Sequence, residues 1–151
     1  MRRADKEIID RKAIEEIIHS AHVCRLGMID NNTPYIVPLN FGYRHGTFYF
    51  HSARAGRKIE ILTRGQRVCI EIDGNHELGM AEAACDWGMR YASVIAYGLP
   101  RFIEEPLAKR EGLAIIMAQY AEGTFDFPES AIAATAVWAV DVETITGKQT
   151  L

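Results

Sequence analysis

Residues 48–62, FYFHSARAGRKIEIL, place a hydroxyl group and several cations where a strand gives way to a helix. We expect the strand to end near Ser52 and the helix to start near Arg57. The first N–H groups of a helix have no partner within the helix and attract negative charge. With Ser52, Arg54, Arg57 and Lys58 beside them, they would suit a phosphate or another anion. A solvated surface turn would have the same pattern, and the residues alone leave both interpretations open.

A second group of side chains has the residue types of a zinc site. These are His19, His22 and Cys24. A fourth ligand with matching spacing is missing and the segment crosses an expected helix end, so we predict no metal site, with Cys24 buried in the next strand. The other two cysteines, Cys69 and Cys85, are distant in the sequence. An odd, scattered set suits a reducing compartment better than a disulfide framework, and Cys69 is most simply a small core residue on a strand.

The elements that must position these residues begin with a helix. Asp10 is a suitable N-cap for a helix that runs to about Ala21, with isoleucines 14, 17 and 18 on one face. From Val23 onward the pattern changes to short strands joined by turns, which is typical of a hairpin meander. We expect strands over residues 23–30, 35–44 and 47–53, with turns at 31–34 and 45–46.

The expected strand 35–44 has one apolar face and one unusual face. Pro38 cannot donate a hydrogen bond to a neighbouring strand, and Gly42 leaves room for a close approach. A ligand or a partner could lie against this face, or the strand could be a sheet edge protected against aggregation. The pattern does not decide between them. Alternation places the core side on Tyr35, Val37, Leu39, Phe41 and Tyr43.

The second half of the chain predicts further strands with helices between them. The alternation of strands through short turns favours a mainly β fold, an antiparallel barrel or sheet with helices packed outside, in a single domain over residues 1–151. No G-x-G-x-x-G follows the first strand and no G-x-x-x-x-G-K-S/T occurs, so the usual dinucleotide and P-loop fingerprints are absent. The expected elements are strands at 66–73, at 91–104 with a bend at 98–100 and at 136–146, and helices at 106–121 and 127–134.

Composition excludes some classes of partner. The formal net charge of the 151 residues is −3, and no block of Lys and Arg is longer than two residues, so nucleic acid is not an expected partner. No run of about 18 apolar residues occurs, and the N-terminus leads into a charged segment instead of the core of a signal peptide. We therefore expect a soluble, cytoplasmic protein that does not bind membranes.

Six segments occur in the order found in one known family. They are VCRLGM, PYIVPLNFGY, FYFHSARAGRKIEIL, RVCIEID, ACDWGMRYASVIAYG and VWAVDVETITGKQ. Together they resemble the nitroimidazole-resistance (Nim-type) flavoproteins of the pyridoxamine 5′-phosphate oxidase-like superfamily, from about residue 2 to residue 149. The resemblance implies an antiparallel, Greek-key type split β-barrel that binds FMN at the interface of a homodimer.

The resemblance also implies a role for individual residues. The isoalloxazine ring would lie along residues 37–40, largely against their backbone groups. His51 and Ser52 would lie beside the flavin, and the cations at the helix start would bind its 5′-phosphate. The full implied set of cofactor-binding residues is Val37, Pro38, Leu39, Asn40, His51, Ser52, Arg57, Lys58, Ser93, Val94, Trp138 and Lys148, of which Trp138 and Lys148 would come from the second subunit.

His51 is the candidate catalytic residue. Imidazole, with an unperturbed pKa of about 6.5, can donate a proton to a substrate that is being reduced, and a histidine that only hydrogen-bonds the flavin is the equal alternative. Trp87 could shield the flavin or line a substrate pocket, although a core or dimer contact is the more common role of such a residue. Arg90 and Tyr91 could form a substrate clamp, but a solvated strand start is the simpler interpretation.

The resemblance implies an FMN-dependent oxidoreductase. NADH, NADPH or another reductant would load the flavin, and electrons would pass to a small nitroaromatic such as a 5-nitroimidazole. Oxidation of pyridoxamine phosphate is not expected, because the chain departs from those oxidases at YIVPLN and ends in TGKQTL instead of a phosphate-binding segment. A flavin-binding electron carrier or redox sensor without turnover is the main alternative, and a haem-binding or haem-degrading protein is a further one.

Overall fold

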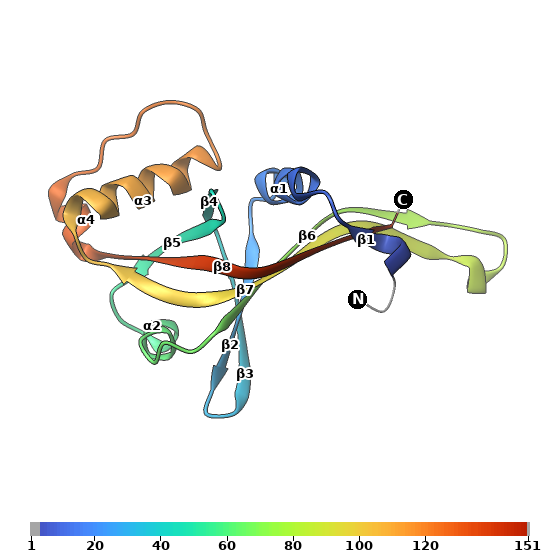
Figure 1. Ribbon diagram of the computed structural model, residues 1–151, viewed down its shortest axis with the longest axis horizontal. Coiled ribbons are helices and arrows are strands. Elements are labelled where there is room, and N and C mark those ends of the chain that lie inside the picture. The colour runs from blue at the N-terminus through green and yellow to red at the C-terminus, as the bar shows by residue number, and fades with distance from the viewer. Residues whose placement is uncertain (1–3, 151) are drawn as a thin grey trace.

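The computed structural model describes residues 4–150, and its eight strands form one antiparallel sheet (Figure 1). The order is β3-β2-β6-β7-β8-β5-β4, and β1 pairs with β8. The strands are β1 (Glu7–Ile8), β2 (Cys24–Asp30), β3 (Thr33–Leu39), β4 (Gly42–Arg44), β5 (Thr47–Ala53), β6 (Val68–Gly79), β7 (Gly88–Ile103) and β8 (Thr135–Thr150). The helices are α1 (Arg11–Ser20), α2 (Arg57–Leu62), α3 (Pro106–Ala118) and α4 (Glu129–Ala134), with 3-10 turns η1 (Ala4–Lys6) and η2 (Ala84–Asp86).

Two long strands, β7 and β8, connect the halves of the sheet. They pair along nearly their whole length, with a register shift between Tyr97 and Gly98. A Cβ at Gly98 would lie 2.3 Å from the carbonyl oxygen of Asp141, so a residue without a side chain is required at the shift. The bend predicted at residues 98–100 is therefore confirmed as an irregularity in the β7–β8 ladder.

The strand predicted over residues 35–44 is wrong as a single element. Its two parts, β3 and β4, lie at opposite ends of the strand order. The break follows from contacts with α3 and the residues after it. The N–H of Phe41 donates to the hydroxyl of Tyr120 at 2.8 Å instead of to a neighbouring strand. A Cβ at Gly42 would lie 2.5 Å from the carbonyl oxygen of Ile115, so the close approach that Gly42 permits is that of α3.

Helices α1 and α3 cover different faces of the sheet. Ile14 and Ile18 of α1 pack into the main core, which also contains Trp138 and Val140 of β8. On the other face, which we call the outer face, Leu113 of α3 packs against Ile103 of β7 and against Val137 and Ala139 of β8. Helix α3 therefore covers that end of the outer face.

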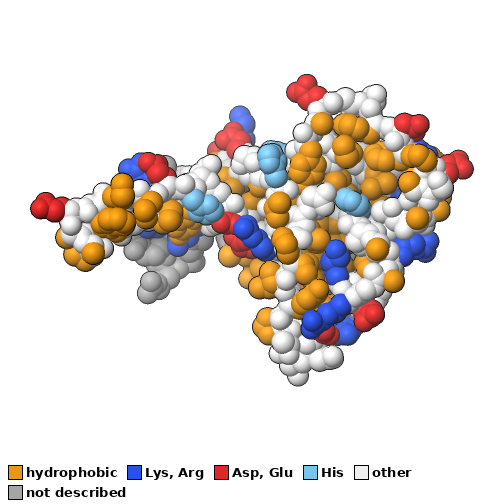
Figure 2. All heavy atoms as spheres, turned by 180° about the vertical axis from the view of Figure 1, so that it is seen from behind, with side chains coloured by type: hydrophobic (Ala, Val, Ile, Leu, Met, Phe, Trp, Pro, Cys, Tyr) orange, Lys and Arg blue, Asp and Glu red, His pale blue; other side chains and the backbone are white. Residues whose placement is uncertain are grey.

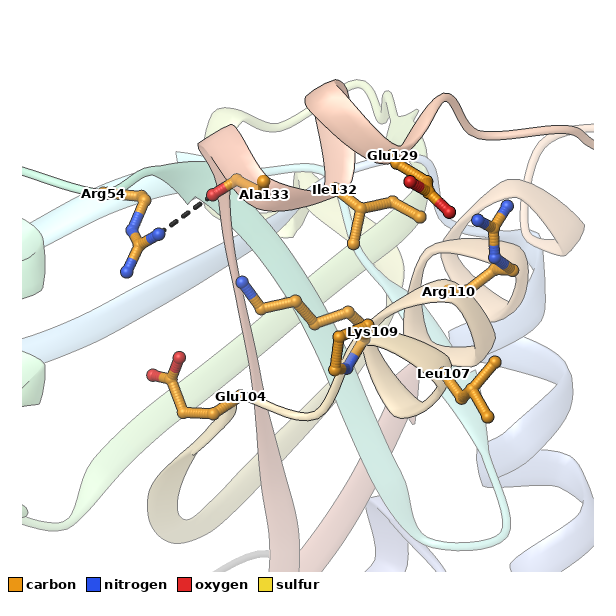
Figure 3. Close-up of a pocket in the computed structure, with 9 residues that line it drawn as sticks. Arg54, Glu104, Leu107, Lys109, Arg110, Glu129, Ile132 and Ala133 are labelled. Atoms are coloured by element: carbon orange, nitrogen blue, oxygen red, sulfur yellow. Dashed lines mark hydrogen bonds between the residues drawn. The ribbon is translucent and has the colours of Figure 1, made fainter.

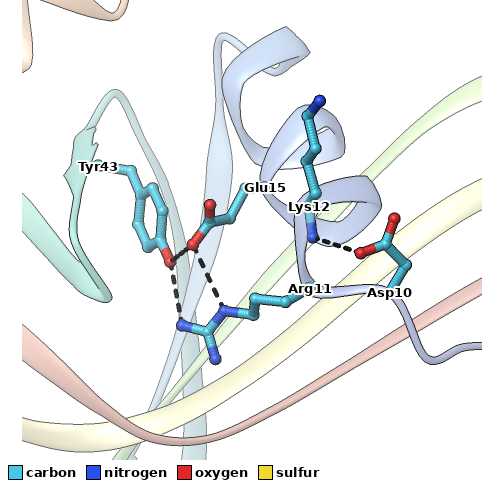
Figure 4. A network of polar contacts seen from close by, with 5 residues as sticks. All are labelled: Asp10, Arg11, Lys12, Glu15 and Tyr43. Atoms are coloured by element: carbon cyan, nitrogen blue, oxygen red, sulfur yellow. Dashed lines mark hydrogen bonds and ion pairs between the residues drawn. The ribbon is translucent and has the colours of Figure 1, made fainter.

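The start of α1 is fixed as the sequence predicts. The Asp10 carboxylate accepts a hydrogen bond from the Lys12 N–H at 3.0 Å. Arg11 donates to the hydroxyl of Tyr43 on β4 and to Glu15, and that hydroxyl donates to Glu15 (Figure 4). This network joins α1 to the strand that follows the break, so it helps to hold β4 away from β3.

The β6–β7 hairpin extends beyond the body of the molecule as an arm (Figure 1). Its exposed large apolar residues are Leu78, Met80, Trp87 and Met89. The indole N–H of Trp87 donates to the carbonyl of Ala81 at 2.7 Å, which closes the arm's tip. Hydrophobic side chains gather along the arm and over the body in the view from behind (Figure 2). Trp87 is therefore not a core residue of this chain.

Among residues 4–150, no helix combines the length and hydrophobicity that crossing a bilayer requires. Within the same range, no three His, Cys, Asp or Glu side chains are grouped so that they could share a metal ion. His19 and His22 are exposed, whereas Cys24 is buried and its burial raises the pKa of the thiol to about 12. Cys69 differs from the prediction, because it is half-buried beside Tyr97 instead of in the core.

Candidate functional site

The candidate site is the corner between the end of β5 and the start of α2. Gly56 is the N-cap of α2, with a φ of 118° that favours glycine, and no side chain in the described chain caps the helix. Nothing lies within 4 Å of the position of a Cβ at Gly56. Because α2 has only six residues, its own dipole is small, and the nearby cations must supply most of the attraction for an anion.

Lys58 and His51 are the two electrostatically unusual residues of this corner. Lys58 is half-buried and forms no hydrogen bond or ion pair with residues 4–150. Burial lowers its pKa. The Nδ1 atom of His51 is buried without a hydrogen-bond partner in the same residues. Burial and, second, the charge of Lys58 lower the pKa of His51, so the two side chains interact. A half-buried cation and an unpaired ring nitrogen are groups that a bound anion with polar atoms would satisfy.

Arg57 has partners within the protein. Its Nε donates to Asp30 at 2.9 Å, and its guanidinium carbon lies 4.3 Å from the centre of the Tyr35 ring. Arg64 also donates to Asp30, and these two hydrogen bonds lower the pKa of that carboxyl. Since Asp30 ends β2 and Tyr35 lies on β3, these contacts place the start of α2 beside the β2–β3 hairpin.

The neighbouring strand β3 is a sheet edge. It pairs with β2, and its other side has no strand partner among residues 4–150. Val37 and Leu39 are half-buried, whereas Pro38 and Asn40 are exposed. The edge position explains why a proline is tolerated in the middle of this strand. The backbone of residues 37–40 is therefore available to a ligand or to another chain, and both alternatives from the sequence remain compatible with the edge.

Other predicted site residues lie on the outer face of the sheet. Strand register puts Pro38, Arg25, Glu71 and Ile95 in one row across β3, β2, β6 and β7, so their side chains share this face. Ser93 lies two residues before Ile95 and pairs with Lys148 of β8. Pro38, Ser93 and Lys148 therefore share one face.

Two predicted residues lie on the opposite side. Val94 and Trp138 are fully buried in the core of this chain, where the Trp138 ring stacks on Phe50 with ring centres 4.2 Å apart. The Nε1 atom of Trp138 has no hydrogen-bond partner in the described residues. Contact between these side chains and a ligand would require the core to open, and a side chain packed in its own core cannot reach into a second subunit. We therefore leave both residues out of the proposed site.

Ser52 follows His51 near the end of β5 and is half-buried. Its hydroxyl donates a hydrogen bond to the carbonyl oxygen of Ala53 at 3.0 Å. The structure thus brings His51, Ser52, Arg57 and Lys58 to the same strand–helix junction that the sequence pattern indicated.

The sequence interpretation missed Lys109 on α3. This residue is 5% exposed, whereas the apolar Leu107 on the same helix is 73% exposed. The buried positions of α3 include 109, 112 and 116, a spacing typical of one helix face. That spacing could have identified residue 109 as buried, although a lysine is rarely found at a buried position.

Among known protein families, the model described as pyridoxamine 5′-phosphate oxidase matches residues 10–149 of this chain. The chain belongs to the pyridoxamine 5′-phosphate oxidase family. The match includes the strand–helix junction, the edge strand and β8, and the open antiparallel sheet agrees with the split barrel expected from the sequence. A search of functionally curated proteins finds no significant match.

Three solved structures have the same fold as this family member. A candidate 5-nitroimidazole antibiotic resistance protein from Bacteroides thetaiotaomicron is 40% identical, with a TM-score of 0.86, over 95% of this chain and 86% of that chain. The flavocytochrome Anf3 from Azotobacter vinelandii is 21% identical, with a TM-score of 0.89, over 100% and 72% of the respective chains. The FAD and haem binding protein from Mycobacterium smegmatis is 16% identical, with a TM-score of 0.88, over 96% and 73%. The predicted resemblance to Nim-type members of the superfamily is confirmed by the first of these.

Proposed function

We propose that the chain is an FMN-dependent oxidoreductase that reduces a small nitroaromatic compound, such as a 5-nitroimidazole, with electrons from NADH, NADPH or another reductant. The observation that carries the proposal is the corner where half-buried Lys58, without a counter-charge among residues 4–150, lies near the unpaired Nδ1 of His51. The 40% identity to a candidate 5-nitroimidazole resistance protein supports the substrate class.

The residues of the corner suit the parts of a mononucleotide. Lys58 would bind the 5′-phosphate together with Arg57 and the first N–H groups of α2. The open backbone edge of residues 37–40 would lie against the ring system, with Ser52 beside it. A bound flavin would supply the electron transfer, for which protein side chains have no equivalent.

His51 would hold or deliver the proton that reduction requires. Because its pKa lies below the ordinary value of 6.5, the ring is neutral at pH 7 in the flavin-free chain. A phosphate beside Lys58 would offset the lysine charge and raise the pKa of His51. Nucleotide binding would therefore bring the imidazole closer to the range in which it exchanges protons at neutral pH.

We also propose that the protein acts as a homodimer through the outer face of the sheet. The outward residues of β7 include Ile95, Tyr97 and Leu99, which are 37%, 42% and 48% exposed. This face carries Pro38, Ser93 and Lys148, so a second copy that covers it would enclose the flavin between two chains. Lys148 could then contact the flavin bound to the partner.

Flavin binding is tested first with purified protein. Incubation with FMN followed by gel filtration should leave the yellow flavin spectrum with the protein, and reduction by dithionite should bleach it. Protein that carries no flavin absorbance after this treatment would refute the proposal. Hemin is the comparison ligand because two relatives of this fold are a flavocytochrome and a haem-binding protein. A Soret band without flavin binding would favour the haem alternative.

Turnover is tested separately from binding. FMN-loaded protein should oxidise NADH or NADPH in the presence of a 5-nitroimidazole, and His51→Ala should lower this rate while FMN remains bound. The control is His45→Asn in the β4–β5 turn, where the φ of 50° suits asparagine. Bound FMN with no turnover on nitro or quinone acceptors would instead support an electron carrier or redox sensor.

A further inference from the structure

A cavity between α3 and α4 borders the proposed flavin corner at Arg54 but is not lined by His51, Ser52, Arg57 or Lys58 (Figure 3). Its volume is about 490 Å³, within the usual range for sites that bind small molecules. A second cavity of about 240 Å³ shares Arg54, Glu104 and Lys109 with it, so these residues lie where the two meet. Leu107 and Ile132 supply apolar wall. The space is large enough for a compact organic molecule.

Lys109 gives this cavity an unusual charge. Lys109 is only 5% exposed, and its ammonium group donates a hydrogen bond to the carbonyl oxygen of Thr135 at 2.9 Å. No described carboxylate forms an ion pair with it. An ammonium group carries three N–H donors, so two of them have no partner within residues 4–150. Removing an ammonium group from water is costly unless a counter-charge or further hydrogen bonds compensate, which indicates a missing negative partner.

Two arginines reinforce the positive charge. Arg54 donates to the carbonyl of Ala133 at 2.9 Å, and Arg110 donates to that of Phe127 at 2.8 Å. These contacts hold each guanidinium group in place, but a carbonyl oxygen has no formal charge and does not neutralise it. Arg110 has in addition a long ion pair, 3.5 Å, with the exposed Asp126.

The cavity also carries two carboxylates. Glu104 and Glu129 line it, and neither forms an ion pair with Lys109 within the described chain. Three cations against two carboxylates give the lining a net positive charge, which the ion pair of Arg110 with Asp126 offsets in part. In Figure 3 the Lys109 side chain extends toward the end of the cavity that holds Arg54 and Glu104, whereas Glu129 is drawn near Arg110. Two cations and one carboxylate therefore lie at the Arg54–Lys109 end, and Glu104 forms no ion pair with either cation within residues 4–150.

We propose that this cavity binds a small organic anion, with one carboxylate or phosphate group on an apolar body. The anionic group would accept hydrogen bonds from Lys109 and Arg54, and the body would lie against Leu107 and Ile132. This proposal does not depend on flavin binding, since neither cavity is lined by His51 or Lys58.

The test uses the full-length protein, loaded with FMN if it binds FMN and otherwise as purified. Benzoate and phenyl phosphate represent the two anionic groups, and benzamide is the neutral counterpart of benzoate. Calorimetry should give saturable binding of at least one anion, at least tenfold tighter than that of benzamide. Amide NMR shifts should concentrate in α3, α4 and the start of β8. Equal binding of benzoate and benzamide, or shifts confined to the flavin residues 37–40, 51–52 and 57–58, would overturn the proposal.

Variants assign the binding to the cavity. Lys109→Met keeps the length of the side chain without its charge and should weaken the preferred anion at least tenfold, whereas Lys12→Met on the exposed face of α1 should leave it unchanged. Ile132→Trp should block binding by filling the cavity. If Lys109→Met does not fold, the affinity of Arg54→Gln for the anion provides the test, because Arg54 is exposed. Unchanged affinity for the anion in folded Lys109→Met or in Arg54→Gln contradicts the proposal. Anion binding by the monomer that is absent from the dimer also contradicts it.

Discussion

The two cations that begin α2 differ in their surroundings, although they are adjacent in sequence. Arg57 is exposed and its charge is offset by Asp30, while Lys58 is half-buried and has no such partner in the described chain. A charge already neutralised by a carboxylate has less to offer an incoming phosphate. The two residues should therefore contribute unequally to FMN binding.

We predict that Lys58→Met weakens FMN binding by about tenfold or more, the size expected for a lost hydrogen bond between charged groups. Arg57→Met should have a smaller effect, because the charge that it removes is already largely offset by Asp30. Fluorescence titration of FMN measures both constants, with Lys12→Met as the control. A larger loss from Arg57→Met than from Lys58→Met would contradict this assignment of the phosphate site.

His51 makes stability depend on pH in a predictable direction. Its pKa in the folded chain is lowered below 6.5, chiefly by burial and then by Lys58. Between that lowered value and 6.5 the unfolded chain binds a proton that the folded chain does not, so unfolding becomes easier as pH falls. The stabilisation is complete above pH 6.5 and is lost as pH falls through this window.

Urea unfolding from pH 5 to pH 8 should therefore show a smaller acid loss of stability in His51→Gln than in the unsubstituted chain. In Lys58→Met, NMR titration should place the pKa of His51 closer to 6.5 without reaching it, because burial is the larger cause. A pKa of His51 above 6.5 in the flavin-free protein would show that the ring has a different environment.

At the scale of elements, β4 and α3 approach each other closely at Gly42. A Cβ on Gly42 would meet backbone atoms of Ile115 and Ile116 at 2.5 and 2.6 Å. Backbone cannot rotate away as a side chain can, so α3 would have to shift relative to β4. That shift would also strain the hydrogen bond between Tyr120 and the N–H of Phe41.

Gly42→Ala should accordingly lower the free energy of unfolding by about 1–3 kcal/mol, the usual cost of overpacking. Gly88→Ala on β7 is the matched control, since nothing lies within 4 Å of a Cβ there and its φ is unexceptional. Chemical denaturation of the two variants measures the difference. Equal stability would mean that α3 adjusts without cost.

The elements that the sequence predicts well are those set by local chemistry. Asp10 caps α1, Pro106 occupies the first turn of α3, and His45 and Gly46 take the positive φ angles of a tight turn. The break after Leu39 was not predictable in this way. It depends on Tyr120 and Ile115, which lie more than 70 residues later in the chain and leave no periodic signal near residue 40.

The same distinction applies to the candidate site. The junction of His51, Ser52, Arg57 and Lys58 is contiguous, so its chemistry is visible in one stretch of sequence. Burial of Lys109 and the pairing of Arg57 with Asp30 depend on packing between distant segments. Residue types therefore identified the junction, while the distribution of free charge around it required the structure.

At the scale of the whole molecule, the outer face is the surface that a second copy would cover. Tyr97→Asp should shift the protein from dimer to monomer, because it places a charge in the apolar row formed with Ile95 and Leu99. Light scattering after gel filtration measures the mass. FMN retention should fall in the same variant if the cofactor lies between the two chains.

Ile9→Asp is the control, because Ile9 is also a large exposed apolar residue but lies outside this row. It should leave the mass and the flavin content unchanged. A monomeric unsubstituted protein that binds FMN fully would contradict the proposed interface while leaving the phosphate-binding corner intact.

The position of β8 has a consequence for how the chain is made. This strand pairs with β7, β5 and β1, all of which leave the ribosome before it. Until residues 135–150 emerge, the nascent chain carries three strands whose partner has not yet been synthesised, and their open edges are prone to association with other chains. Completion of the sheet consequently waits for β8, and overexpression should be limited by aggregation of chains that still lack this strand more than by instability of the finished fold.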